Sequence, residues 1–356
     1  KMHQLRQVSG NLPEKDYLLM NKKQIFIFIC LTAVCLLVGG CGQKKRDMVS
    51  KKGFFFDTMI SVSILCEEQE QGEHVLDEAF AKCAEYEDIF SRTKENSELY
   101  RLNHRTESEA VVSEDLYALL SCAKEYYEVT GGRFDISVAP LSDLWDFKNE
   151  DPKVPDEEEI KKTLEKVGYS RVHLEAGDKV KFDDPNTMLD LGALAKGYIA
   201  DRLKEYLVSE GIESGYINLG GNVLTIGEKE DGSPWEIGIQ KPFAERNEIV
   251  AYVDAAGSSV VSSGIYERYF EADGELYYHV LDPETGYPVE TDLAQVTILS
   301  KSSLEGDALS TSCLILGYEK GRKLIENTAG VEAVFVRKDG KVEATDGVEL
   351  KGDGKD

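Results

Sequence analysis

Apolar residues recur along the chain with two different periods, one typical of helices and one of strands. Between residues 74 and 90 they return every three or four positions, at Val75, Ala79 and Cys83, which predicts a helix that buries one face. The same period predicts helices over residues 116–129, 194–209, 304–316 and 318–327, with shorter helical segments over 140–145 and within 151–165.

Segments rich in β-branched and aromatic residues predict strands, most of them in the C-terminal half. They cover residues 54–65, 216–219, 223–226, 235–240, 249–253, 259–263, 266–270, 276–280 and 294–299, and a final hairpin joins 333–337 to 341–345. Strands and helices do not alternate regularly, so the pattern indicates the α+β class rather than a doubly wound sheet. We expect one large domain over residues 54–346, with antiparallel sheets packed by helices, and a polar tail over 347–356.

An apolar run near the N-terminus has neither period. Residues 25–38 contain one clearly polar side chain, Thr32, and follow a short basic segment that starts at Met20. The run is too short for a comfortable membrane-spanning helix, which needs about 20 residues, and it fits the apolar part of a signal peptide over residues 20–40. Residues 1–19 contain no apolar run, and we interpret them as an over-extended N-terminus.

The apolar run ends in Leu-Val-Gly-Gly-Cys at residues 37–41, which resembles a bacterial lipobox. In such a motif the cysteine thiol accepts a lipid, so Cys41 is the expected lipidation site. We expect residues 41–53 to form a tether that holds the protein at the extracytoplasmic face of the cell membrane. The alternative is a plain membrane anchor in which the cysteine is incidental. The spacing of the remaining cysteines neither suggests zinc nor pairs them in disulfides: Cys66, Cys83, Cys122 and Cys313.

The charge of the chain limits its partners. Its formal net charge is −25, and residues 1–40 carry five basic and two acidic side chains, a net +3, which leaves −28 for the rest. Nucleic acid is therefore excluded as a partner, because its phosphates need a surface rich in Lys and Arg. A small polyanionic ligand would need a local device such as a divalent cation, a helix N-terminus or a placed lysine.

Two clusters of polar and glycine residues adjoin predicted helices. Residues 130–135 read Thr-Gly-Gly-Arg-Phe-Asp, in which the glycines let the backbone approach a ligand closely; the same residues also fit a helix cap followed by a strand. Asp190 and Gly192 precede a helix that carries Lys196 in its first turn, which is a natural phosphate site but lacks the order of a P-loop. The alternative for Lys196 is a solvated helix charge.

Two further clusters lie in the C-terminal half. A predicted strand leads through His279 into a turn at residues 282–286, and histidine is the natural proton shuttle near neutral pH; the alternative is an ordinary hairpin turn. Asp307 and Thr311 are four residues apart, so they share one face of a helix and offer oxygen ligands to a cation such as Mg²⁺. The alternative is that Thr311 bonds to the helix backbone and no metal is bound.

Taken together and in this order, these clusters resemble the ApbE family of FAD:protein FMN transferases. The resemblance runs from about residue 54 to about residue 345, and each of its segments would be weak evidence alone. The segments are residues 90–103, 130–145, 190–201, 218–222, 263–268, 279–286 and 307–311. Two positions depart from the family pattern: Phe56-Asp57-Thr58 stands where Met-Gly-Thr is usual, and Thr93 stands where a tyrosine is common.

The resemblance implies metal-dependent cleavage of FAD, in which FMN passes to a Thr or Ser hydroxyl of a partner flavoprotein and AMP leaves. Carried over by position, Asp307, Thr311 and the backbone carbonyl of Ala193 would hold Mg²⁺, and His279 is the candidate base. The FAD site would be lined by Phe56, Arg133, Phe134, Asp135, Asp190, Lys196 and Leu281. The acceptor would be a flavoprotein subunit with a Ser/Thr flavinylation motif. Three alternatives stay open: an FAD pyrophosphatase, a non-catalytic flavin-binding lipoprotein, and a generic solute-binding lipoprotein.

Overall fold

The computed structural model describes residues 46–352 with the exception of residue 246. The predictions for residues 1–19, for the signal peptide at 20–40 and for lipidation of Cys41 lie outside the described residues. Within the described part, no helix is both long enough and apolar enough to cross a bilayer.

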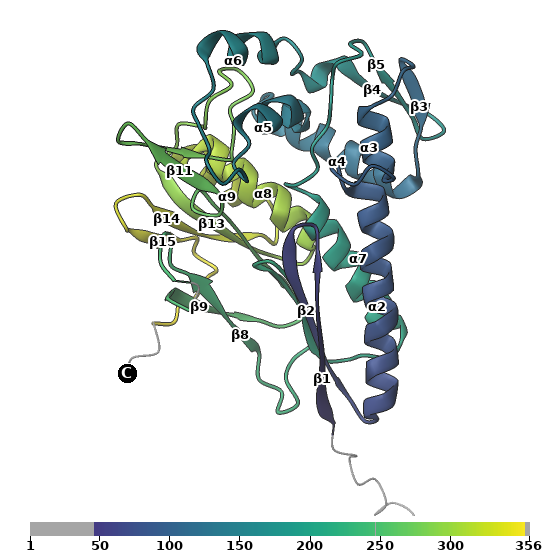
Figure 1. The fold of residues 1–356 in the computed structure, drawn as a ribbon. Helices are drawn as coiled ribbons and strands as arrows, with labels where there is room; N and C mark the ends of the chain where they lie inside the picture. The colour runs from purple at the N-terminus through teal and green to yellow at the C-terminus, as the bar shows by residue number, and fades with distance from the viewer. Residues whose placement is uncertain (1–45, 246, 353–356) are drawn as a thin grey trace, which may run out of the picture. The chain divides into compact units, whose positions relative to one another are not determined.

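The architecture is built on one eight-stranded sheet whose neighbouring strands are all antiparallel (Figure 1). In spatial order the strands are β1 (Asp47–Phe55), β2 (Thr58–Cys66), β6 (Gly215–Leu219), β7 (Asn222–Ile226), β10 (Ser259–Gly264), β13 (Leu293–Ser300), β14 (Glu332–Arg337) and β15 (Val342–Ala344). The α+β prediction is confirmed.

Three long helices pack on this sheet: α2 (Gln69–Phe90), α7 (Ala195–Ser209) and α8 (Ser303–Leu316). Helix α8 contacts β10 and β13 as well as α7, so most of its residues are buried, including Asp307 at 1% exposure. A helix buried on all sides normally carries apolar residues, and a carboxylate at its centre must therefore find polar partners. Helix α9 (Tyr318–Glu326) follows α8 and packs on β14.

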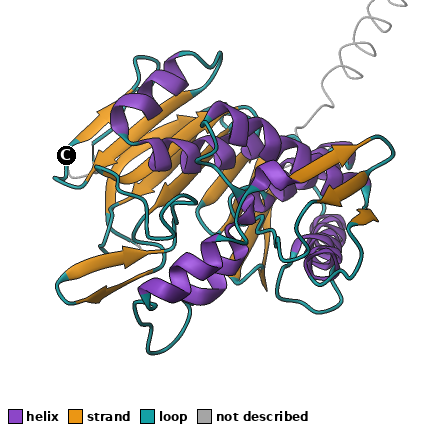
Figure 2. Ribbon diagram, turned by 90° about the horizontal axis from the view of Figure 1, so that it is seen from above, coloured by secondary structure: helices purple, strands orange, loops and turns teal. Residues whose placement is uncertain are grey.

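Smaller elements surround the main sheet, as Figure 2 shows from above. Two hairpins are formed by β8 (Trp235–Gln240) with β9 (Ile249–Ala255) and by β11 (Tyr269–Ala272) with β12 (Glu275–Tyr278). A three-stranded sheet consists of β3 (Glu109–Val111), β5 (Lys179–Phe182) and β4 (Val172–Glu175). The remaining helices are α3 (Glu98–Asn103), α4 (Glu114–Val129), α5 (Ala139–Trp145), α6 (Glu157–Leu164) and the 3₁₀ turns η1 (Ile136–Val138) and η2 (Tyr169–Arg171).

The structure corrects two boundaries of the predicted domain. Residues 54–65 are not one strand but the end of β1, a tight turn and most of β2, and β1 begins at Asp47 inside the predicted tether. The turn residues Phe56 and Asp57 have positive φ angles of 51° and 58°. Part of the predicted polar tail is also ordered, because Lys351 pairs with Tyr252 through two backbone hydrogen bonds.

The described cysteines form no disulfide. Cys66, Cys83 and Cys313 are buried and Cys122 is half-buried, all as free thiols. Burial raises the pKa of Cys83 and of Cys122 to about 12, which keeps both thiols protonated and unreactive.

Candidate active site

The centre of the candidate site is the carboxylate of Asp307, buried where α8 crosses the start of α7. Its Oδ2 accepts a hydrogen bond from the backbone N–H of Gly197 at 3.0 Å, and the ammonium of Lys196 lies 3.2 Å from Oδ1 and 3.4 Å from Oδ2. Lys196 also donates to the carbonyl of Gly192 at 3.0 Å. One cation thus lies among three oxygens at the positively polarised end of a helix.

Gly197 allows the two helices to come this close. A Cβ at this position would lie 2.3 Å from the carbonyl oxygen of Ser303 and 2.6 Å from the Cα of Leu304. The N–H of Gly197, which in a continuous helix would bond the carbonyl of Ala193, donates to Asp307 instead. The Ala193 carbonyl, on the last turn before α7, is therefore released from the helical pattern.

Thr311 lies one turn after Asp307 on α8 and at the edge of a hydroxyl cluster. The Oγ of Ser263, on β10, is 2.7 Å from the Oγ of Ser310 and 3.3 Å from the Oγ1 of Thr311. Carboxylate, carbonyl and hydroxyl oxygens are the kinds of ligand with which Mg²⁺ is usually held, its other positions being filled by water and substrate phosphates. Among the described residues no group of three or more His, Cys, Asp or Glu side chains forms a conventional metal cage.

Asp190 lies in the loop before α7 and fixes that loop. Its Oδ1 accepts from the N–H of Gly192 at 2.8 Å, and its Oδ2 pairs with Arg92 Nε at 2.9 Å. Arg92 also pairs with Asp143 at the end of α5. Arg92, which follows α2, therefore connects the loop before α7 with α5, and all three segments are distant in sequence.

His279 follows β12 and has an unusual environment. Its backbone N–H donates to the carbonyl of Arg268 at 3.1 Å, while the ring atom Nδ1 is buried and has no hydrogen-bond partner among the described residues. Burial, reinforced by the charges of Arg268 and Lys196, lowers the pKa of His279 to about 4. The imidazole is therefore neutral near pH 7 and keeps a lone pair with which it can accept a proton.

The turn after His279 is held by an ion pair. Arg133 Nη2 lies 2.7 Å from Oδ2 of the buried Asp282, whose Oδ1 accepts from the N–H of Glu284. Leu281, the residue before Asp282, is buried in a small hydrophobic cluster that includes Trp145. The ion pair therefore joins the two sequence clusters at 130–135 and 279–286 into one part of the structure.

Phe134 and Asp135 differ from the open ligand contacts that the motif suggested. Phe134 is buried in the main core against Tyr126. The carboxylate of Asp135 accepts from the N–H and hydroxyl of Ser137 and from the N–H of Tyr169, and burial raises its pKa in spite of these bonds. In this structure both side chains support the fold beneath the site, and Arg133 is the member of the segment that reaches toward it.

Phe56 lies in the β1–β2 turn, where its N–H donates to Glu87 Oε1 at 2.8 Å. Its neighbour Asp57 forms an ion pair with Lys148. The hydrogen bond to Lys148 holds the pKa of Asp57 below its usual range, with smaller contributions from Arg268 and Arg92. The turn therefore belongs to the same charged cluster as Asp190 and His279.

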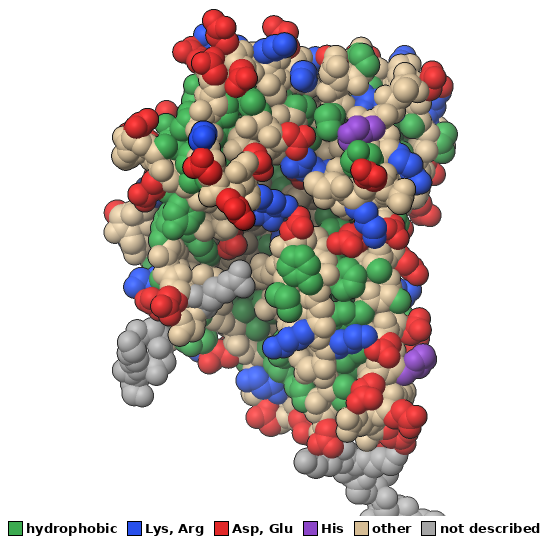
Figure 3. All heavy atoms as spheres, viewed as in Figure 1, with side chains coloured by type: hydrophobic (Ala, Val, Ile, Leu, Met, Phe, Trp, Pro, Cys, Tyr) green, Lys and Arg blue, Asp and Glu red, His purple; other side chains and the backbone are tan. Residues whose placement is uncertain are grey.

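Three basic residues of the site were not predicted from the sequence: Arg92, Arg268 and Lys148. The sequence shows each of them as a basic residue in an acidic chain, and Arg268 lies in one of the motif segments. Their contacts with residues distant in sequence could not be predicted from the spacing of residues along the chain. Figure 3, viewed as in Figure 1, shows acidic side chains spread over the visible face of the molecule and a group of Lys and Arg side chains near its centre.

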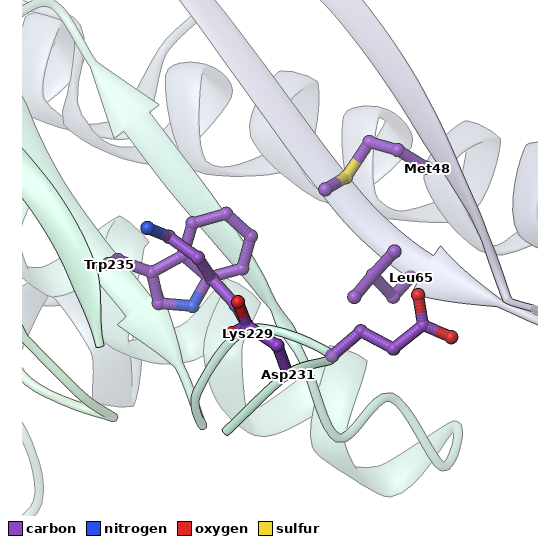
Figure 4. A pocket seen from close by; sticks show the side chains of 6 residues that line it. Met48, Leu65, Lys229, Asp231 and Trp235 are labelled. Atoms are coloured by element: carbon purple, nitrogen blue, oxygen red, sulfur yellow. The ribbon is translucent and has the colours of Figure 1, made fainter. Parts of the chain in front are cut away.

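A separate pocket of about 550 Å³ lies away from this cluster (Figure 4). It is lined by Met48, Leu65, Lys229, Glu230, Asp231 and Trp235. None of the site residues expected from the sequence contributes to it, so the pocket is distinct from the candidate active site.

Comparison with known proteins shows to which family the chain belongs. The model of the ApbE family matches residues 56–335. An FAD:protein FMN transferase of Treponema pallidum is 34% identical over 336 residues, which is 88% of this chain and 92% of the relative. An FAD:protein FMN transferase of Klebsiella pneumoniae is 38% identical over 268 residues, which is 75% of this chain and 83% of the relative.

Solved structures show the same fold. The ApbE protein of Thermotoga maritima superposes with a TM-score of 0.77 at 29% identity, covering 84% of this chain and 97% of that one. The flavin transferase ApbE of Vibrio cholerae gives a TM-score of 0.74 at 27% identity, covering 84% and 96%. Because the family model and these relatives span most of the chain, the protein belongs to the ApbE family.

Proposed function

We propose that the protein is an FAD:protein FMN transferase, which passes the FMN part of FAD to a Thr or Ser hydroxyl of a partner flavoprotein and releases AMP. The hydroxyl oxygen attacks the FMN phosphorus, the bond from that phosphorus to the bridging oxygen breaks, and that oxygen leaves with AMP. The observation that carries the proposal is the junction of α7 and α8 in a chain of this family. There Lys196 and the buried Asp307 meet at a helix N-terminus, with a neutral histidine near Lys196.

The oxygen set at this junction suits Mg²⁺, with Asp307, Thr311 and the Ala193 carbonyl as its protein ligands. When bound, the cation would supply charge neutralisation for the pyrophosphate. The ammonium of Lys196 stands in for such a cation in this structure, because it lies within 3.4 Å of both Asp307 oxygens. The residues present therefore fit the ion.

The basic side chains of the site position the other phosphate oxygens. Lys196 at the N-terminus of α7, together with Arg92, Arg133 and Arg268, provides the positive charge that the acidic chain otherwise lacks. Phe56, Asp190 and Leu281 would contact the rest of FAD. Phe134 and Asp135 contribute by holding the segment that presents Arg133.

His279 takes the proton of the attacking hydroxyl at its ring nitrogen. Its low pKa keeps it neutral in the free protein, and a bound pyrophosphate would raise that pKa because negative charge stabilises the imidazolium. The histidine thus becomes a better base when its substrate is present.

We place the reaction at the outer face of the cell membrane, where a lipid on Cys41 would hold the enzyme. The support is the lipobox-like sequence that ends at residue 41. Acceptor subunits anchored in the same membrane would then be within reach.

The test is an incubation of residues 42–356 with FAD, Mg²⁺ and an acceptor that carries an Asp/Ser-Gly-Ala-Thr-like segment, followed by mass spectrometry of the acceptor. A mass gain of one FMN supports the proposal. Free FMN and AMP without labelling would mean a pyrophosphatase, and unchanged FAD would mean a binding protein. Asp307→Ala should abolish transfer, whereas Asp346→Ala, at a fully exposed carboxylate, is the matched control.

A further inference from the structure

A chain of hydroxyl groups connects strand β10 with the two residues of α8 that fit Mg²⁺. The Oγ of Ser263 lies 3.3 Å from the Oγ1 of Thr311 and 2.7 Å from the Oγ of Ser310. The Ser310 hydroxyl donates in turn to the backbone carbonyl of Asp307 at 3.0 Å. Three contacts therefore run in sequence from Thr311 through two serines to the backbone of Asp307.

Ser263 reaches this chain because of its place on β10. Side chains alternate between the two faces of a strand, and a Cβ added to Gly306 of α8 would lie 2.9 Å from Val261, two residues before Ser263. Ser262, between them, bonds instead to its cross-strand partner Thr297 at 2.8 Å. Ser263 therefore faces α8, and Ser262 faces the other side of the sheet.

Counting donors gives the direction of the three hydrogen bonds. Each hydroxyl has one proton, and the Asp307 carbonyl can only accept, so the Ser310 proton points to that carbonyl. The 2.7 Å contact then needs the proton of Ser263, and the 3.3 Å contact needs the proton of Thr311. The reverse direction would leave two oxygens 3.0 Å apart at Asp307 without a proton between them.

This direction decides what the Thr311 hydroxyl can bind. A threonine in a helix often donates to the carbonyl four residues earlier, but here that carbonyl, of Asp307, already accepts from Ser310. The Thr311 proton goes to Ser263, and the lone pairs of its oxygen stay available. Groups that fix the orientation of a metal ligand in this way contribute to metal affinity without touching the ion.

We propose that Ser263 is a positioning residue of the Mg²⁺ site, which accepts the Thr311 proton and so keeps the lone pairs of this hydroxyl free for the ion. The inference rests on the Mg²⁺ site of the proposed function, because Thr311 needs a fixed orientation only if it binds a metal. Ser310 has a supporting part, since it takes the proton that Ser263 would otherwise turn toward Thr311.

The test compares three variants at neighbouring positions of β10. Ser263→Ala removes the acceptor, whereas Ser263→Thr keeps a hydroxyl and suits a strand. Ser262→Ala is the matched control, because it also removes one serine hydroxyl and one hydroxyl contact, on the other face of the sheet. The measurements are calorimetric titration with Mg²⁺ and thermal unfolding in chelator and in Mg²⁺.

We expect the Kd for Mg²⁺ to rise about tenfold in Ser263→Ala, as for the loss of a hydrogen-bond partner of a metal ligand. The Kd should stay within about twofold of wild type in Ser263→Thr and in Ser262→Ala. Both alanine variants should lose a similar amount of Tm in chelator, but only Ser263→Ala should gain less Tm from Mg²⁺. An unchanged Kd in Ser263→Ala, or an equal rise in Ser262→Ala, overturns the inference.

A double-mutant cycle separates positioning of Thr311 from a general structural effect. Thr311→Val removes the hydroxyl and keeps the shape of the side chain. In that background Ser263→Ala should weaken Mg²⁺ binding no further, because there is no proton left to accept. A further tenfold loss would show that Ser263 does not act through Thr311, and the inference would fall.

Failure of the proposed function gives a different result. If wild type binds Mg²⁺ but labels no acceptor, and Ser263→Ala weakens the binding, the positioning role stands and the transfer chemistry falls. If wild type labels an acceptor and Ser263→Ala binds Mg²⁺ as wild type does, the chemistry stands and the positioning role falls. Wild type that binds no Mg²⁺ overturns the positioning role together with the proposed ligand set.

Discussion

Replacing Lys196 by methionine tests the idea that its ammonium occupies the place of a metal ion. Methionine keeps most of the aliphatic stem but removes the charge that lies between both Asp307 oxygens and the Gly192 carbonyl. In the variant without metal, the buried Asp307 carboxylate keeps the hydrogen bond from Gly197 but has no neutralising charge. The variant should therefore be less stable than wild type in the presence of a chelator.

The size of the loss follows from the burial of the pair. Breaking a fully buried ion pair costs about 3–5 kcal/mol, but the Lys196 side chain is 30% exposed, so water replaces part of the interaction and about 1–2 kcal/mol remains. An unfolding entropy of about 2.1 cal/mol/K per residue amounts to about 0.6 kcal/mol/K for about 300 residues, so Tm should fall by about 2–3 °C.

Adding Mg²⁺ should reverse the difference. In wild type the ion must displace the ammonium, whereas in Lys196→Met the carboxylate has no competing cation. At a concentration about 100 times its dissociation constant an ion stabilises by about 2.7 kcal/mol, so the variant should recover its lost Tm and gain more from Mg²⁺ than wild type does.

The assay is thermal unfolding in chelator and in Mg²⁺, with calorimetric titration of the metal. Lys204→Met is the matched control, because Lys204 lies on the same helix but donates only to the carbonyl of Gly257. If Lys196→Met binds Mg²⁺ no more tightly than wild type, or if the control responds in the same way, the stand-in role of Lys196 is refuted.

Three further features of the structure lead to measurable outcomes. Because the pKa of His279 is lowered to about 4, kcat/KM should hold from neutral pH down to about 5 and fall only near pH 4; an acid limb near pH 6.5 would contradict a histidine that its surroundings keep neutral. The same lowered pKa means that the stability contributed by His279 is complete above about pH 6.5 and is lost progressively between about pH 6.5 and pH 4. Acid unfolding, with His279→Gln as the reference, can measure this loss. Gly197→Ala should destabilise the fold by about 1–3 kcal/mol in denaturant titration and weaken Mg²⁺ binding, because its Cβ collides with the Ser303 carbonyl; unchanged values of both would contradict the close helix contact. Thiol titration of denatured residues 42–356 without reductant should find four free cysteines, and fewer would reveal a disulfide.

Periodicity predicted the helices well and the short strands poorly. The long helices α2, α4, α7 and α8 carry apolar stripes over several turns, so their existence followed from the sequence and only their ends shifted by a few residues. Strands β3, β4 and β5 were missed, because three or four residues such as Lys179–Phe182 give too short an alternation. The β1–β2 turn was missed for another reason: Phe56 and Asp57 adopt positive φ without a glycine to announce it.

The candidate site, like the fold, could be predicted from the sequence only in part. Asp307 and Thr311 share a helix face, so their common direction could be predicted from spacing, and the structure places Lys196 against Asp307 across two helices. The burial of Phe134 and Asp135 could not be predicted, because a Gly-Gly-Arg-Phe-Asp segment reads equally as a ligand loop or as a fold support. In the structure Phe134 packs against Tyr126, and Asp135 accepts hydrogen bonds from Ser137 and Tyr169, contacts that support the fold.

The distribution of charge explains how so acidic a chain could accept a pyrophosphate. Three of the four basic residues proposed to bind phosphate are already paired with a carboxylate: Arg92 with Asp190, Arg133 with Asp282 and Lys196 with Asp307. Most of the positive charge of the site is therefore already neutralised before ligands bind, and an anion can recruit these three cations only if their carboxylates find another partner. A divalent cation at Asp307 would provide that partner and release Lys196 toward the phosphates. Binding of the cation and of FAD would then each favour the other, since both require the same ion pair to open.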